Sequence, residues 1–315
     1  MGTPEFAVPS LRSVAERCDV AAVVTQPDRP RGRGRTLAAS AVAEEAGRLG
    51  LEIWKPEDVR VSEMRDRLAA VAPDLFAVVA FGAILTPALL ALPKLGSLNL
   101  HGSLLPDYRG ASPVQRALWD GRGWTGVTTL WMDEGVDTGD CALQRWTAIE
   151  PADDAGTLTR RLASLGAPLL AESLVRAHAG ELPRLPQELG AGSYARKLRK
   201  EDGRVNWALD AVTVWNRQRA MTPWPGATTA WQGRRLRIEA ARPAHVLPTG
   251  EPAGTVLGTD GEDLLVACAP GALLVTRVTP EGRASMPASE WARGARVEAG
   301  GRLGIGTERE EEAHA

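Results

Sequence analysis

The sequence is poor in the residues that build disulfide-linked or metal-held scaffolds. Its 315 residues include only three cysteines, Cys18, Cys141 and Cys268, and no CxxC pair. An odd, widely spaced set of this kind argues against a disulfide framework and fits a reducing compartment. The four histidines also lie too far apart in sequence to indicate a metal site by their spacing. We therefore expect a cytoplasmic protein that needs no metal.

Long apolar runs and a charge of one sign are also missing. Residues 75–93 carry no charge, but Gly82 and Pro87 interrupt them, and a spanning helix needs about 20 continuous apolar residues. We therefore prefer a buried strand and a short helix here to a membrane segment. The formal net charge of −2 gives no whole-chain case for nucleic-acid binding. Residues 193–237 nevertheless hold ten basic and three acidic side chains, which weakly indicates a polyanionic partner.

What is present is a globular composition, with 44% hydrophobic and 24% charged residues in a chain long enough for two domains. Apolar strand patterns alternate with helical patterns in the first half. Strands are expected at 20–25, 51–54, 75–80, 97–100 and 127–132, and helices at 5–16, 36–49, 62–70, 113–119 and 155–178. This alternation predicts an α/β fold with a doubly wound, mostly parallel sheet.

The second half follows a different pattern. Short strands expected at 235–240, 254–258, 264–268 and 272–278 are separated by Gly, Pro and Asp turns, which predicts a small antiparallel barrel or sandwich. A loop-like stretch rich in proline and glycine precedes it. We therefore expect a first domain at 1–180, a linker at 181–202, a second domain at 203–305 and a disordered acidic tail at 306–315.

Chemically active side chains concentrate between residues 97 and 140. Asn99 and His101 lie two residues apart at the end of a predicted strand, so their side chains share one face. Ligands bind beyond the carboxyl ends of strands in open parallel sheets. Asp133, Asp137 and Asp140 follow in a glycine-rich loop. An amide, an imidazole and one of these carboxylates together suit attack on a carbonyl group. Structural roles stay open, because such a histidine is often a hydrogen-bonded scaffold residue and such an aspartate a turn former.

Other reaction classes find less support in the sequence. Ser103 is a possible nucleophile, but GSLLP lacks the GxSxG elbow. The sequence Gly32-Arg33-Gly34 lacks the third glycine of a dinucleotide fingerprint, and no phosphate-binding Walker motif occurs. The residues alone therefore indicate a carbonyl-directed site at a sheet edge and do not name the reaction.

Two long motifs carry a family resemblance. HGSLLPDYRGASPVQRALWDG at 101–121, followed by TGVTTLWMDEGVDTGD at 125–140, resembles the signature of the formyltransferases that use 10-formyltetrahydrofolate. The resemblance implies that Asn99, His101 and Asp137 are the catalytic trio. It also implies folate contacts from Ser103, Leu104, Leu105 and Pro106, and from Phe81 and Gly82. Phe81 stands where the family usually has tyrosine, which leaves the pocket apolar.

Further segments resemble those of the methionyl-tRNA formyltransferases within this family. They are GTPEFA at 2–7, QPDRP at 26–30 running into RGRGRTL, SYARKL at 193–198 and WPGA at 224–227. The resemblance implies a C-terminal OB-like domain and initiator methionyl-tRNA as partner. We further expect a monomer. The implied tRNA contacts are Arg29, Arg31, Arg33, Arg35 and Lys197. Without the resemblance, an arginine run of this kind would be read as a solvated loop.

Three alternatives remain. A sugar-nucleotide formyltransferase would share the HGSLLP and DTGD motifs, although a small nucleotide sugar needs no arginine-bearing loop. Glycinamide ribonucleotide formyltransferases usually lack a second domain. A catalytically inactive RNA-binding relative would keep the fold, but the intact trio of Asn99, His101 and Asp137 weighs against it.

The sequence opens inside a turn. A doubly wound domain normally begins with a strand, and in the family resembled here an apolar strand precedes the turn at Gly2-Thr3-Pro4. That strand would lie in the middle of the sheet. We therefore expect a gap between the strand at 20–25 and the strand ending at Ala80. We also expect the 315-residue form to be unstable, and an upstream extension of about ten residues to rescue it by supplying apolar contacts.

Overall fold

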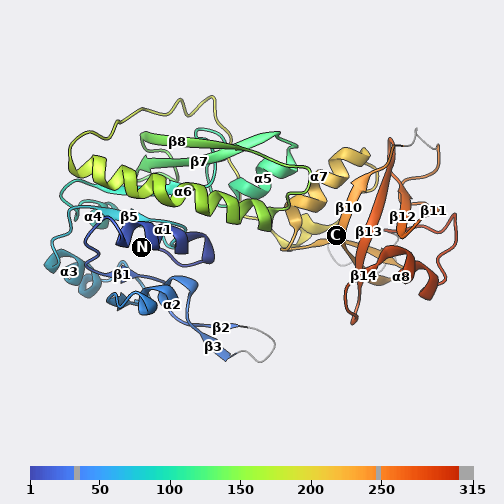
Figure 1. Ribbon diagram of the computed structural model, residues 1–315, viewed down its shortest axis with the longest axis horizontal. Helices are drawn as coiled ribbons and strands as arrows, with labels where there is room; N and C mark the ends of the chain where they lie inside the picture. The colour runs from blue at the N-terminus through green and yellow to red at the C-terminus, as the bar shows by residue number, and fades with distance from the viewer. Residues whose placement is uncertain (32–35, 246–249, 305–315) are drawn as a thin grey trace, which may run out of the picture. The chain divides into compact units, whose positions relative to one another are not determined.

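The computed structural model describes residues 1–31, 36–245 and 250–304, and the chain forms two compact units (Figure 1). Unit 1 holds Met1–Pro113, Trp124–Ala148 and Thr157–Arg196. Unit 2 holds Val114–Gly123, Ile149–Gly156 and the described residues from Lys197 onward. Much of the expected linker, up to residue 196, therefore belongs to unit 1. Within the described ranges, every helix is too short or too polar to cross a membrane.

Unit 1 is an α/β unit, as the sequence predicted. Its helical elements are η1 (Glu5–Ala7), α1 (Val8–Ala15), α2 (Ala41–Arg48), α3 (Ser62–Ala70), α4 (Pro87–Leu90) and most of α6 (Ala155–His178). Its strands are β1 (Val23–Val24), β2 (Arg29–Arg31), β3 (Thr36–Ala38), β4 (Ile53–Trp54), β5 (Phe76–Val78), β6 (Ser97–His101), β7 (Trp124–Trp131) and β8 (Cys141–Ala148). Strands β1 and β4 are parallel, as are β5 and β6, whereas β7 and β8 add to β6 in antiparallel order. The sheet arrangement is therefore mixed.

One expected helix begins later than predicted. Residues 36–38 form β3 and pair with β2, although the sequence pattern favoured a helix from residue 36. Ser40 explains the change, because its side chain accepts a hydrogen bond from the amide of Ala43 and caps α2. A cap of this kind satisfies a free helix amide and fixes where the helix begins.

Helix α6 determines the position of the strand that carries the candidate site. It lies alongside β7 (Figure 1), and Thr129 Oγ1 of β7 lies 2.8 Å from Ser173 Oγ of α6. A Cβ atom at Gly166 would lie 2.7 Å from Leu100 Cδ2, closer than real contacts allow. Glycine at this point lets the helix approach β6 closely, and Leu158 and Leu170 are fully buried on the same helix.

Unit 2 is built around an antiparallel sheet. Its helical elements are α5 (Pro113–Trp119), η2 (Lys200–Gly203), α7 (Ala211–Met221) and α8 (Ala288–Gly294). The strands β9 (Ala227–Trp231), β10 (Arg234–Pro243), β11 (Val256–Asp260), β12 (Asp263–Ala267) and β13 (Ala272–Pro280) run in the order β11-β12-β13-β10-β9, with β14 (Met286–Pro287) on β13.

The two edges of this sheet are joined by the segment 300–304. Gly304 donates its amide to the carbonyl of Ala230 in β9, and Val256 of β11 donates to the carbonyl of Gly301. No direct pairing between β9 and β11 occurs among the described residues. The arrangement therefore agrees with the small antiparallel domain expected here, although the ladder itself stays open.

Candidate active site

Asn99, His101 and Asp137 meet at the end of β6. Asn99 and His101 are two residues apart on that strand, and Asp137 comes from the loop between β7 and β8. The amide Nδ2 of Asn99 donates to Asp137 Oδ1 at 3.2 Å, and Nδ1 of His101 lies 3.5 Å from Asp137 Oδ2. The side chains of His101 and Asp137 are 6% and 15% exposed. The structure thus brings together an amide, an imidazole and a carboxylate in a largely desolvated place.

The second ring nitrogen of His101 defines its tautomer. Nε2 lies 2.9 Å from the carbonyl oxygen of Tyr108. Because a carbonyl can only accept, Nε2 carries a proton and donates it. Nδ1 then faces the carboxylate of Asp137, so a proton placed on Nδ1 is shared with Oδ2. The pair can hold one additional proton next to Asn99.

Asp137 is fixed from several sides. Its backbone adopts φ +56°, a left-handed conformation that aspartate tolerates better than most residues. The amide of Gly110 donates to Oδ2 at 2.8 Å, and Gln187 Nε2 donates to the carbonyls of Asp137 and Gly139 at 2.9 and 2.7 Å. Gln187 lies in the stretch expected to be a linker, so no motif or spacing connected it with this site.

Position 110 requires glycine, because a side chain there would collide with its neighbours. Its φ is +103°, and a Cβ atom there would lie 2.8 Å from the carbonyl oxygen of Ala195. The tight approach lets the Gly110 amide reach the carboxylate of Asp137. A glycine in the motif YRGAS is thus part of the site through its backbone alone.

Thr128 of β7 holds the loop 103–106 in place through two hydrogen bonds. The hydroxyl of Thr128 donates to the carbonyl of Ser103 at 2.7 Å and accepts from the amide of Leu105 at 3.1 Å. The hydroxyl of Ser103 turns inward and donates to the carbonyl of Asp107 at 2.6 Å. Ser103 and Leu105 are buried, whereas Leu104 and Pro106 are partly exposed. The loop therefore presents only its apolar Leu104 and Pro106 side chains.

The other expected folate contacts lie in different surroundings. Phe81 is 3% exposed and belongs to an apolar cluster with Val78, Leu85 and Leu89. Its carbonyl accepts a hydrogen bond from Thr3 Oγ1 at 2.8 Å. Phe81 is thus a core side chain, while Gly82, at φ +84°, is exposed.

The expected tRNA-contacting residues are only partly within the described ranges. Arg29 is exposed on β2, opposite Ala38 of β3, and the backbone of Arg31 ends that strand. Arg33 and Arg35 lie outside the described residues. Lys197 is exposed in unit 2. In the part of the chain that the structure describes, no group of three or more His, Cys, Asp or Glu side chains is arranged to hold a metal ion.

Comparison with known proteins places these features in one family. Residues 5–174 match the formyl transferase family, and residues 197–296 match the formyl transferase C-terminal domain. The chain belongs to the formyl transferase family. Methionyl-tRNA formyltransferase of Geobacter sulfurreducens is 46% identical over 305 residues, which cover 96% of this chain and 95% of the relative. That of Solibacter usitatus is 44% identical over 307 residues, 97% and 98% of the two chains.

A solved structure shares the fold of this formyltransferase. WlaRD, a sugar 3N-formyl transferase in the presence of dTDP and 5-N-formyl-THF, aligns with a TM-score of 0.65. The alignment covers 90% of this chain and 97% of the other at 17% identity, so it supports the fold alone. The α/β domain followed by a sheet domain, predicted from the sequence, is confirmed.

Proposed function

We propose that this formyltransferase transfers the formyl group of 10-formyltetrahydrofolate to the α-amino group of initiator methionyl-tRNA, as a cytoplasmic monomer. The main support is the 46% identity to a methionyl-tRNA formyltransferase over nearly the whole of both chains. The convergence of Asn99, His101 and Asp137 supports it independently, because these groups suit attack by an amine on a formyl carbon.

The proposed chemistry uses the hydrogen-bonding groups of the trio that remain available for the substrates. Asn99 uses one amide N–H on Asp137, and its second N–H is the donor for the oxyanion that develops on the formyl oxygen. The amine nitrogen forms a bond to the formyl carbon and loses a proton, which the His101–Asp137 pair holds. The bond from that carbon to N10 then breaks, and the proton passes to N10. One proton thus moves from the amine to N10, and no further reactant is consumed.

In this proposal the folate lies against the loop 103–106. Leu104 and Pro106 provide apolar contact, while Ser103 and Leu105 hold the loop in place through their buried side chains and backbone. Gly82 provides exposed backbone groups for contact with the folate, and Phe81 packs behind the pocket as a core side chain.

Replacing Thr128 with Val should weaken folate binding about tenfold. Valine keeps the shape, but the carbonyl of Ser103 and the amide of Leu105 lose their partner, so the loop loses order that folate binding must restore. An ordering cost of about 1.4 kcal/mol corresponds to the tenfold loss of affinity. Calorimetric titration with a folate analogue measures the change. Thr125→Val is the matched control, since Thr125 is also buried on β7 but does not bond to this loop. Equal affinities of the two variants would contradict the anchoring role.

The expected tRNA contacts are Arg29, Arg31, Arg33, Arg35 and Lys197, with the basic residues of 193–237 as a phosphate track. Replacing the arginines at 31, 33 and 35 with Ala should weaken tRNA binding and leave folate binding unchanged. Each lost phosphate contact should flatten the slope of log affinity against log salt by about one unit. Filter binding across a salt series measures this, with Arg65→Ala as control, because the Arg65 side chain on α3 is exposed. An unchanged slope would assign these arginines to solvent.

A transfer assay with labelled 10-formyltetrahydrofolate tests the function itself. We expect label in methionyl-tRNA and none in a nucleotide-linked amino sugar. Label in the sugar alone would favour the sugar-nucleotide reaction. Tight tRNA binding without transfer to either acceptor would indicate an inactive RNA-binding relative.

A further inference from the structure

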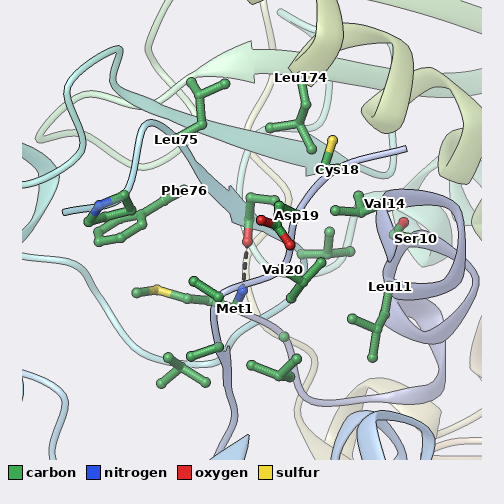
Figure 2. Close-up of a pocket in the computed structure, with 18 of the residues that line it drawn as sticks. Met1, Ser10, Leu11, Val14, Cys18, Asp19, Val20, Leu75, Phe76 and Leu174 are labelled. Atoms are coloured by element: carbon green, nitrogen blue, oxygen red, sulfur yellow. Dashed lines mark hydrogen bonds between the residues drawn. The ribbon is translucent and has the colours of Figure 1, made fainter. Parts of the chain in front are cut away.

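The catalytic trio lies outside the apolar cavity that Figure 2 shows. Strands β1 and β5 are not joined by a ladder among the described residues, and this cavity of about 690 Å³ lies between them. Val23 of β1 and Phe76 of β5 line it, whereas Asn99, His101 and Asp137 do not. The trio is therefore held in place by other segments of unit 1.

One such segment is the strap, which we define as residues 181–196 of unit 1. Leu185 in the strap exchanges two backbone hydrogen bonds of 2.9 Å with Cys141 at the start of β8. Further along, the amide of Arg109 donates to the carbonyl of Ser193 at 2.9 Å, and the amide of Ala195 donates to the carbonyl of Arg109 at 2.6 Å. The strap, which the sequence pattern assigned to a linker, thus pairs with β8 and with the loop that follows β6.

Both ring nitrogens of His101 face a residue with a left-handed backbone. Nε2 donates at 2.9 Å to the carbonyl of Tyr108, whose φ is +59°. Nδ1 lies 3.5 Å from Oδ2 of Asp137, whose φ is +56°. Among the non-glycine residues described in unit 1, only Ala72 and Ala80 also have a positive φ. Residues with a side chain rarely adopt this conformation, and they keep it where the surrounding structure holds them.

The strap supplies one side chain to each of these two residues. Gln187 Nε2 donates to the carbonyl of Asp137 at 2.9 Å and to that of Gly139 at 2.7 Å. Ser193 Oγ accepts a hydrogen bond from the amide of Tyr108 at 2.9 Å. Both contacts are made to the peptide groups of the left-handed residues themselves, so they act on the backbone that aims each residue at the imidazole.

We propose that Gln187 and Ser193 are positioning residues for formyl transfer. Gln187 keeps the carboxylate of Asp137 opposite Nδ1 of His101, and Ser193 keeps the carbonyl of Tyr108 opposite Nε2. The imidazole then has one tautomer and one orientation, with Nδ1 available for the proton that the amine loses. The inference rests on the proposed function, because it assigns both side chains to the His101–Asp137 pair. A purely structural strap would stabilise unit 1 through all of its contacts alike.

The first test compares Gln187→Met with Arg184→Met on the same strap. Methionine keeps the length of glutamine but donates no hydrogen bond, so kcat should fall about 10–100-fold, as expected for a displacement of about 1 Å. The KM values for folate and tRNA should stay within about twofold. The exposed guanidinium of Arg184 lies 3.8 Å from the ring centroid of Trp131, and its loss should leave kcat unchanged. Equal kcat values for the two variants would overturn the role of Gln187.

Two variants at position 193 test the other end of the strap. Ser193→Ala removes the acceptor for the Tyr108 amide and should lower kcat about fivefold to tenfold. Ser193→Thr keeps a hydroxyl and should restore most of that loss. The same low kcat in both variants would contradict the role of the hydroxyl.

A double variant separates positioning from general damage to the fold. Gln187→Met should cost little when Asp137→Asn is already present, because Gln187 acts through Asp137. If the two losses multiply instead, Gln187 affects the rate independently of the carboxylate, which contradicts the proposal.

Nitrogen NMR of the imidazole gives a readout that needs no transfer. The chain has four histidines, so the His101 signals are identified by their loss in His101→Gln. Wild-type His101 should show the Nε2–H tautomer, and Gln187→Met and Ser193→Ala should each move both ring signals toward the average of the two tautomers. Arg184→Met should leave them unchanged. If one variant does not fold, the variant at the other end of the strap decides.

The two readouts also distinguish this proposal from the proposed function. Unchanged His101 signals in the folded variants would overturn the positioning role even where methionyl-tRNA is formylated. Shifted signals in a protein that formylates no methionyl-tRNA would support the positioning role and contradict the proposed function alone.

Discussion

Replacing Asp137 with Asn should lower kcat by about 10²–10³, the usual effect of losing one preorganised group that stabilises a developing charge. The amide keeps the shape of the carboxylate, so the fold and tRNA affinity should change little. It cannot share a proton with Nδ1 of His101, and its N–H would face the amide of Gly110, which now donates to Oδ2. Single-turnover transfer of labelled formyl measures the chemical step apart from binding.

Asp133→Asn is the matched control for this substitution. Asp133 lies in the same loop, but its carboxylate accepts from the amide of Gly135 and the hydroxyl of Thr138 and is not bonded to the trio. It should keep nearly full activity. The double variant with Asn99→Ala and Asp137→Asn should lose less kcat than the product of the two single losses, because the two side chains share a hydrogen bond. A wild-type rate for Asp137→Asn would remove the carboxylate from the mechanism.

The parts of the site that follow from local pattern were predictable. Asn99 and His101 follow a buried strand at a spacing of two, so the shared face and the sheet edge came from periodicity alone. Asp137 came from the family motif. Gln187 and Gly110 could not be found in this way, because one lies in a stretch typical of a linker and the other acts through its backbone amide.

The fold was predictable to a similar extent. Helices at 62–70, 113–119 and 155–178 begin and end as expected. Helix α7 was missed because its sequence, AVTVWNRQRAM, is rich in β-branched and aromatic residues, and tertiary packing outweighs that preference. The antiparallel direction of β7 could not be read from the sequence, since buried strands of either direction are apolar runs.

Replacing Arg219 with Met should destabilise unit 2 by about 3–5 kcal/mol, because three acceptors lose their donor at about 1–3 kcal/mol for each buried group. Arg219 on α7 is 8% exposed, and burial lowers its pKa. Its Nη1 donates to the carbonyls of Glu150 and Asp153 at 3.1 and 3.2 Å, and Nη2 donates to Asn216 Oδ1 at 2.7 Å. Methionine fills the space over the ring of Trp215 but leaves these three acceptors without their donor.

The matched control is Arg217→Met on the same helix. Arg217 is less buried, and its guanidinium lies over the ring of Trp119 at 4.5 Å, so methionine should cost only about 1 kcal/mol. Urea unfolding followed by circular dichroism, with hydrogen exchange to localise the change, should separate the two variants. Because Arg219 connects residues 150–153 to α7, exchange should rise first at those two places. If Arg219→Met unfolds at the same urea concentration as Arg217→Met, water replaces the guanidinium at these carbonyls and the network adds no stability.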